Sequence, residues 1–144
     1  MPIQQGLTNS FKQEMLQMGQ DVITDTLYMA LYTAFSDIGQ ETTVYTTTNE
    51  ITGTGYTAGG ELVTGAVLST QTTGPNAGTV FVNFDNVSWP GASFTARGAL
   101  IYNVTRSNKS VAVLDFGSDK TFTSSNNTVT MPANTATTAL IRFP

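Results

Sequence analysis

Hydrophobic residues repeat with a helical period only near the start of the chain. The positions spaced by four, four and three residues are Leu7, Phe11, Met15 and Met18. This spacing places their side chains on one face of a helix, so we predict a helix over 10–18, about three turns long. A helix this short is not stable alone in water, and we therefore expect it to dock on another surface.

The ends of this helix carry their own signals. Ser10 and Gln13 have the spacing of a capping box, and Thr8 or Asn9 could cap the helix equally well. Gly19 stands where a C-terminal glycine is expected to end the helix.

From residue 24 onward the hydrophobic period changes to two. In the stretch DTLYMALYTA, alternate residues on one side are Leu27, Met29 and Leu31, and those on the other are Tyr28, Ala30 and Tyr32. Apolar residues on both sides predict a strand buried on both faces. A polar loop follows, with a short edge strand predicted at 43–47.

The rest of the chain alternates between strand patterns and turn clusters. Further strands are predicted at 61–69, 79–84, 94–103, 110–116, 128–131 and 138–143, with turns at 73–78, 89–91, 106–109 and 124–127. This spacing favours a mainly β fold, an antiparallel β-sandwich or jelly-roll-like barrel with one short N-terminal α-helix. We predict one domain over 1–144, made of an N-terminal arm and docking helix (1–19) and a β-sandwich (24–144).

The amino-acid composition limits the classes of partner that we expect for this protein. Only 11% of residues are charged, against about 25% in an average protein. Threonine, serine and asparagine take their place, which is typical of extracellular or virion β proteins. The net charge of −4 and six scattered Lys and Arg residues argue against nucleic acid as a partner. No run of 18 apolar residues is present, so no membrane partner is expected, and MPIQQGLTNSF lacks the layout of a signal peptide, which predicts cytoplasmic synthesis.

The chain contains no cysteine and no histidine. Disulfides, thiolate nucleophiles, Cys/His zinc sites and His-based triads are therefore excluded. We predict a protein that is not an enzyme, with no catalytic residue, no cofactor and no metal site.

The stretch GTGYTAGG raises the question of a phosphate-binding loop. Its glycines are Gly53, Gly55, Gly59 and Gly60. A dinucleotide fingerprint requires a helix directly after the glycines, whereas ELVTGAVLS reads as a strand, and no Gly-Lys-Ser/Thr follows. We therefore interpret the glycines as turn geometry and predict positive φ at one or more of them, with no ligand.

Three acidic residues could be imagined as a carboxylate pair or a calcium site: Asp85, Asp115 and Asp119. Their sequence lacks the ligand density that calcium requires, so turn chemistry is the favoured interpretation. Arg97 interrupts a neutral strand, where it could pair with Asp115 or Asp85 or reach a partner subunit. Gly98 beside it suggests a bulge or the close approach of another chain.

Trp89, the only tryptophan, is predicted either as an interface anchor or as a core residue.

The order of several motifs resembles a family of small virion proteins of tailed bacteriophages, of the cyanophage and marine phage type. The motifs are LTNSFKQEMLQ, LYMALYTAFSDIG, YTTTNEITGTGYTAGG, FTARGALIYN and VAVLDFGSDK, which together span nearly the whole chain. The resemblance implies a non-enzymatic virion structural protein, and we favour a capsid decoration (cement) protein that stabilises the head shell. It carries over no catalytic residue.

Under this hypothesis the partners are the major capsid protein and further copies of the chain, as a homodimer or homotrimer. The candidate interface residues are Leu7, Phe11, Met15, Met18, Arg97 and Trp89. Alternatives are a tail, fibre or baseplate component, and, in another class, a carbohydrate-binding module.

Overall fold

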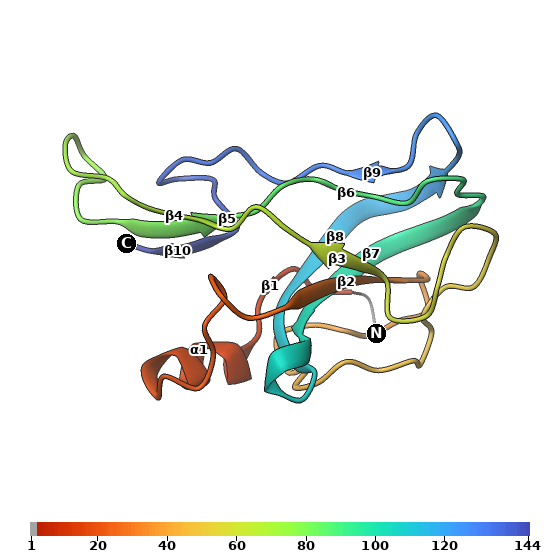
Figure 1. The fold of residues 1–144 in the computed structure, drawn as a ribbon, viewed down its shortest axis with the longest axis horizontal. Helices are drawn as coiled ribbons and strands as arrows, with labels where there is room; N and C mark the ends of the chain where they lie inside the picture. Colours follow the sequence, from red (N-terminus) through yellow and green to blue (C-terminus); the bar gives the residue numbers. More distant parts are fainter. Residues whose placement is uncertain (1–2) are drawn as a thin grey trace.

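The computed structural model describes residues 3–144 and shows a mainly β, sandwich-like fold with antiparallel sheets and one short α-helix (Figure 1). In chain order the elements are β1 (Gly6–Leu7), α1 (Asn9–Leu16), β2 (Leu27–Tyr32), β3 (Glu61–Val63), β4 (Val67–Thr70), β5 (Val80–Asn83), β6 (Val87–Ser88), β7 (Phe94–Asn103), the 3-10 helix η1 (Val104–Arg106), β8 (Lys109–Phe122), β9 (Thr128–Val129) and β10 (Ile141–Phe143).

Three sheets make up the fold. Five strands in the order β1-β8-β7-β2-β3 form the sheet that we call the body. Three strands in the order β10-β5-β4 form a second sheet, called the wing here, which projects to one side of the body (Figure 1). The third sheet is the two-stranded β6–β9 ribbon. All strand pairs are antiparallel, which agrees with the short turn clusters between them.

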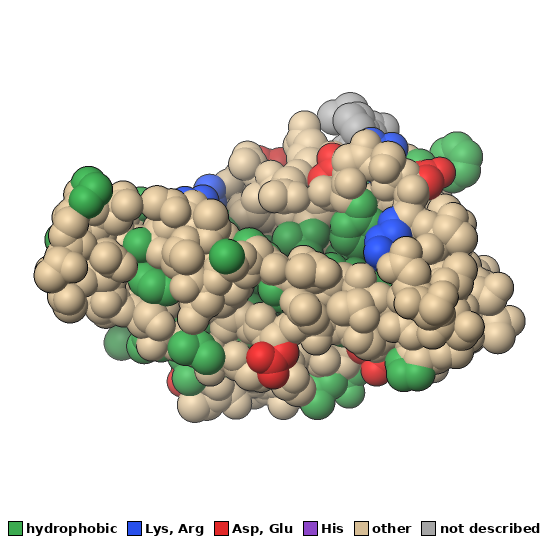
Figure 2. All heavy atoms as spheres, turned by 90° about the horizontal axis from the view of Figure 1, so that it is seen from above, with side chains coloured by type: hydrophobic (Ala, Val, Ile, Leu, Met, Phe, Trp, Pro, Cys, Tyr) green, Lys and Arg blue, Asp and Glu red, His purple; other side chains and the backbone are tan. Residues whose placement is uncertain are grey.

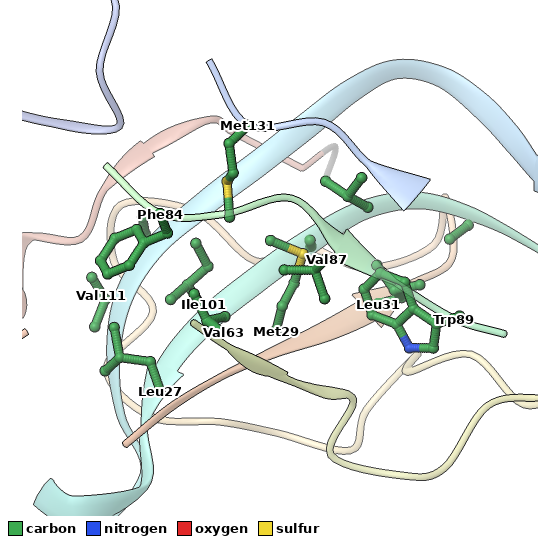
Figure 3. Packing of buried hydrophobic residues seen from close by; sticks show 14 of the residues in the cluster. Leu27, Met29, Leu31, Val63, Phe84, Val87, Trp89, Ile101, Val111 and Met131 are labelled. Atoms are coloured by element: carbon green, nitrogen blue, oxygen red, sulfur yellow. The ribbon is translucent and has the colours of Figure 1, made fainter. Parts of the chain in front are cut away.

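Strand β2 is buried on both faces, as its sequence pattern predicts. Leu27, Met29 and Leu31 belong to the main core, where they pack with side chains such as Trp89 from the opposite layer (Figure 3). Ala30 and Tyr32 belong to a smaller cluster on the other side of the sheet. The loop that follows β2 supplies part of the cover on that side, so both apolar faces of the strand are used.

The helix is real but shorter than predicted. The Thr8 hydroxyl accepts a hydrogen bond from the Phe11 N–H at 3.2 Å, so Thr8 is the cap and the Ser10 capping box is not used. The chain leaves the helix at Met18, which has φ +57°, while Gly19 donates its N–H to the Glu14 carbonyl at 2.7 Å. Met18, and not Gly19, therefore adopts the left-handed conformation that ends the helix.

Two strand predictions are corrected. Residues 43–47 form no strand, because only a single bridge joins Val44 to Lys109. The predicted strand over 61–69 divides at Gly65, which has φ +71° and whose missing Cβ would overlap the Asp85 carboxylate. The chain turns there, so β3 pairs with β2 in the body and β4 pairs with β5 in the wing.

Strand β8 is longer than predicted and contains a wide bulge. The pairing of β7 with β8 passes from Ala96–Lys120 to Gly98–Asp115, so Arg97 alone lies opposite Phe116–Asp119. This confirms the bulge expected from Gly98. Strands β1 and β6 were not predicted, because two residues are too few to produce a periodic pattern.

Candidate functional site

One carboxylate, Glu50, gathers the hydroxyl groups of two tyrosines on the loop after β2. Its side chain accepts hydrogen bonds from the Tyr45 and Tyr56 hydroxyls, both at 2.6 Å, and from the Gly59 N–H at 2.7 Å. The Tyr102 ring from β7 stacks on Tyr45, with centroids 4.6 Å apart, and its hydroxyl donates to the Gly59 carbonyl at 2.7 Å. We call these five residues the tyrosine–Glu50 cluster, and it fastens the loop to the body.

The glycines of GTGYTAGG allow the backbone conformation of this loop. Gly55, Gly59 and Gly60 have φ of +83°, +97° and +85°, which confirms the predicted positive φ, while Gly53 does not share it. A Cβ on Gly60 would overlap the Met29 carbonyl oxygen of β2. The loop therefore approaches a central strand so closely that only glycine fits.

The tyrosines of the cluster act as hydrogen-bond donors. Burial, followed by the nearby Glu50 charge, raises the pKa of Tyr102 to about 12. Burial and the hydrogen bond to Glu50 also raise the pKa of Tyr45 and Tyr56 above their ordinary value. Their hydroxyls stay protonated at neutral pH, and the cluster holds the loop after β2 against the body.

Of the three acidic residues considered from the sequence, Asp115 has a structural role. The Asp115 carboxylate accepts the Gly117 N–H at 2.9 Å and pairs with the Arg97 guanidinium at 3.4 Å. Arg97 therefore pairs with Asp115 and not with Asp85, the other partner considered within the chain. Within residues 3–144, no group of three or more His, Cys, Asp or Glu side chains is arranged to hold a metal ion.

The predicted interface residues separate into buried and exposed ones. Trp89 and Phe11 are fully buried within the chain, which agrees with the core alternative for Trp89, whose ring packs edge-on to Phe122; neither side chain is exposed for contact with a partner. Leu7 and Met15 are partly buried and pack against the same core. Met18 is 87% exposed, because the helix has already ended when the chain reaches it.

The wing exposes apolar side chains that the interface prediction missed. Leu68 is 59% exposed and Phe143 is 43% exposed. Leu68 lies in register with Val82 and Ile141, and Phe143 lies in register with Val80, which places all of them on one face of the wing. On this face Val82 and Ile141 are buried, whereas Leu68 on the outer strand β4 and Phe143 in β10 are open to solvent. The sequence ELVTGAVLST carries no signal for this face, because its large apolar residues stand in adjacent pairs and do not alternate.

A groove separates β8 from β9. It has a volume of about 760 Å³, and its lining includes Leu114, Phe116 and Val129. A second cavity of about 390 Å³ adjoins it and shares Gln5 and Leu114 with it, but reaches toward β10 and is not part of the groove. The view from above shows hydrophobic side chains at the bottom of a hollow in this face (Figure 2).

Comparisons with known proteins add no relative. No protein-family model, no curated protein and no solved structure matches this chain. In residues 3–144, no helix has both the length and the apolar character needed to cross a membrane. The candidate sites therefore rest on the geometry of the wing and the groove.

Proposed function

We propose that this chain is a non-enzymatic structural protein of a tailed bacteriophage particle, a capsid decoration protein that binds the head shell. The observation that carries the proposal is the open apolar face of the wing, together with the resemblance of the motif order to small virion proteins. Leu68 and Phe143 are large apolar side chains left exposed at the end of a projecting sheet. Apolar side chains grouped in this way mark binding surfaces for other proteins.

The two outer strands of the wing add hydrogen-bonding groups to this surface. β4 and β10 each pair only with β5 within the described residues, so each leaves one edge free. An open edge beside an apolar face suits contact with a sheet or an extended segment of another protein. A shell presents many equivalent sites, and modest affinity at each is multiplied if the chain is an oligomer.

The end of the helix supplies a second exposed apolar pair. Leu16 is 88% exposed and follows the buried part of α1, and Met18 lies close behind it. Docking of the helix on a shell or a sister subunit stays a prediction, now assigned to these two residues. The terminal part of the predicted arm, residues 1–2, lies outside the described residues.

Truncation is a poor test of that docking. Removing 1–19 would also remove Phe11 from the core and the pairing of β1 with β8. Replacing Leu16 and Met18 by glutamine leaves both in place. We expect this variant to fold normally and to bind particles more weakly; unchanged binding would contradict docking through the helix.

The positions of the aromatic residues argue against a carbohydrate-binding module. Sugar rings stack on exposed aromatic faces, whereas Trp89 is fully buried and Tyr102 lies 4% exposed inside the tyrosine–Glu50 cluster. Phe35, at 83%, is the most exposed aromatic side chain in residues 3–144, and it does not line the groove. A lone phenylalanine offers no polar group to orient a sugar.

The test of the proposal is the protein composition of purified phage particles. A decoration protein should be present in a copy number similar to that of the major capsid protein, and imaging of intact particles should place it on the outer shell. A far lower copy number with density at the tail would assign the chain to the tail, fibre or baseplate instead. Absence from particles would overturn the virion proposal altogether.

A further inference from the structure

We infer that the groove between β8 and β9 binds an extended polypeptide segment of a partner protein by strand addition to the outer edge of β9. This site lies on a different surface from the wing, so the inference does not depend on the proposed function. It rests on three features of the groove: a free strand edge, an apolar floor and an acidic rim.

The free edge belongs to β9. This strand pairs only with β6, with Val129 opposite Val87 and Thr128 opposite Ser88, and the Asn127 carbonyl accepts the Trp89 N–H at 2.9 Å. Antiparallel pairing alternates, so the backbone groups of residues 127 and 129 face β6 while those of Thr128 and Thr130 face the groove. The Thr128 and Thr130 backbones are bonded to no other backbone group outside the β6–β9 pair in residues 3–144.

The opposite wall, formed by β8, is capped and bulged where the strand passes beyond β1. β1 pairs with β8 only through Gly6 and Leu7, and beyond that point the Gln5 side-chain oxygen takes the Asp115 N–H at 3.0 Å. The Asp115 carboxylate in turn takes the Gly117 N–H at 2.9 Å, inside the bulge of β8. Side-chain capping and a bulge are the usual ways to block an edge strand. An added strand would therefore hydrogen-bond to β9.

The floor of the groove consists of core side chains that remain partly uncovered. Leu114 and Phe116 of β8 pack against the main core but are only half-buried. An added strand pairing with Thr128 and Thr130 would place every second side chain over these two residues. It would also convert the β6–β9 ribbon into a three-stranded sheet, which is the smallest sheet expected to be stable on its own.

The charged residues at the edge of the groove indicate the charge of the partner segment. Asp119 lines the groove and belongs to none of the ion pairs formed within residues 3–144. Lys120 on the same rim keeps its positive charge, but its ammonium contacts uncharged groups, Asn126 Oδ1 at 3.3 Å and the Phe122 ring with its centroid at 5.2 Å, and forms no ion pair with Asp119. The partner segment is thus extended, carries apolar or β-branched residues at alternate positions, and has a basic residue that reaches Asp119.

The experiment uses the full chain and a blocked synthetic peptide of alternating valine and threonine with one arginine, followed by amide NMR. We expect shifts centred on Thr128, Thr130, Leu114 and Phe116. Two further peptides are N-methylated either at every valine or at every threonine. In an added strand only one of these sets faces β9, so the two peptides should differ in affinity by about tenfold or more.

The charge is tested by Asp119→Asn, with Asp37→Asn as the matched control, since Asp37 is exposed and does not line the groove. We expect the first to weaken binding of the arginine peptide and the second to leave it unchanged. Absence of binding, shifts away from β9, or equal affinity of the two N-methylated peptides would overturn the inference. So would concentration-dependent shifts of the same amides without peptide, since these would assign the groove to a second copy of the chain.

Discussion

The body and the wing use apolar strand residues in opposite ways. In β2, at the centre of the body, five of the six residues are buried, whereas none of the four residues of β4 in the wing is buried. Both strands carry large aliphatic side chains. The difference lies in what covers them: the body has a layer on each side, and the outer part of the wing has none.

Because of this difference, we assign the buried side chains of the body to folding stability and the exposed side chains of the wing to binding. Side chains of the body, such as Leu100, are fully buried and contribute to stability through area removed from water. Leu68 in the wing is largely exposed, so its burial is still available to a partner. The account therefore expects changes in the body to alter the free energy of unfolding and changes in the wing to alter association.

The largest effect is expected at the contact between the tyrosine loop and β2. Gly60→Ala forces a Cβ into the Met29 carbonyl at a backbone conformation with positive φ, and should lower the free energy of unfolding by about 4 kcal/mol or more. Urea denaturation followed by circular dichroism measures it.

Gly74→Ala is the matched control for that change. Gly74 has φ +80°, but its Cβ would have no atom within 4 Å. We expect a loss of only about 1 kcal/mol from backbone strain. Similar losses for the two variants would show that the close approach to β2 contributes nothing.

Leucine truncation compares the two regions directly. Leu100→Ala leaves a cavity in the fully buried second core cluster and should cost about 3 kcal/mol. Leu68→Ala removes an exposed side chain and should change the free energy of unfolding by about 0.5 kcal/mol or less. Denaturation midpoints of the two variants, measured side by side, check the comparison; an equal loss would place Leu68 in the folding core.

The tyrosine–Glu50 cluster should give an intermediate effect. Glu50→Gln keeps the size of the side chain but removes the charge that accepts two tyrosine hydroxyls and the Gly59 N–H. We expect a loss of about 2 kcal/mol, because hydrogen bonds to a charged group are the stronger kind. Glu41→Gln serves as the control, because Glu41 is exposed and accepts a single side-chain hydrogen bond, from Asn9 at 2.7 Å, that the glutamine oxygen can keep; we expect little change.

The same cluster predicts a loss of stability in alkali. The pKa of Tyr102 is raised to about 12 in the folded protein, against 10.0 for a free tyrosine. Below pH 10 both states are protonated, and between pH 10 and 12 the unfolded chain loses this proton first, so stability falls by about 1.4 kcal/mol per pH unit. Denaturation across this range should show a smaller slope for Tyr102→Phe; an unchanged slope would contradict the assignment.

Much of the body was predictable because its signals are local and repeated. Strand β7 was predicted with its observed bounds, and β2 was predicted with both faces buried, since each is a run of six or more largely strand-forming residues next to turn or loop signals. The break at Gly65 was missed because it depends on Asp85, which approaches from a distant part of the chain. No local pattern reports such a contact.

The candidate sites were harder to predict than the fold. An apolar residue in a strand reads the same whether it is covered or not, so Trp89 was weighed as an interface anchor and Leu68 was overlooked. The groove depends on the register of β9 with β6 and on the bulge opposite Arg97, and both are tertiary features. Chemistry carried by residue type, such as the absence of histidine and cysteine, could be read directly from the sequence.

The most direct measurement of the division between body and wing uses the double variant Leu68→Gln, Phe143→Gln. It should lose only about 1 kcal/mol of stability relative to the unchanged protein, because Leu68 is 59% exposed and Phe143 is 43% exposed before the change. Its binding to purified phage heads that lack the protein should fall strongly. A variant that binds heads with unchanged affinity, or that loses several kcal/mol of stability, would contradict the account.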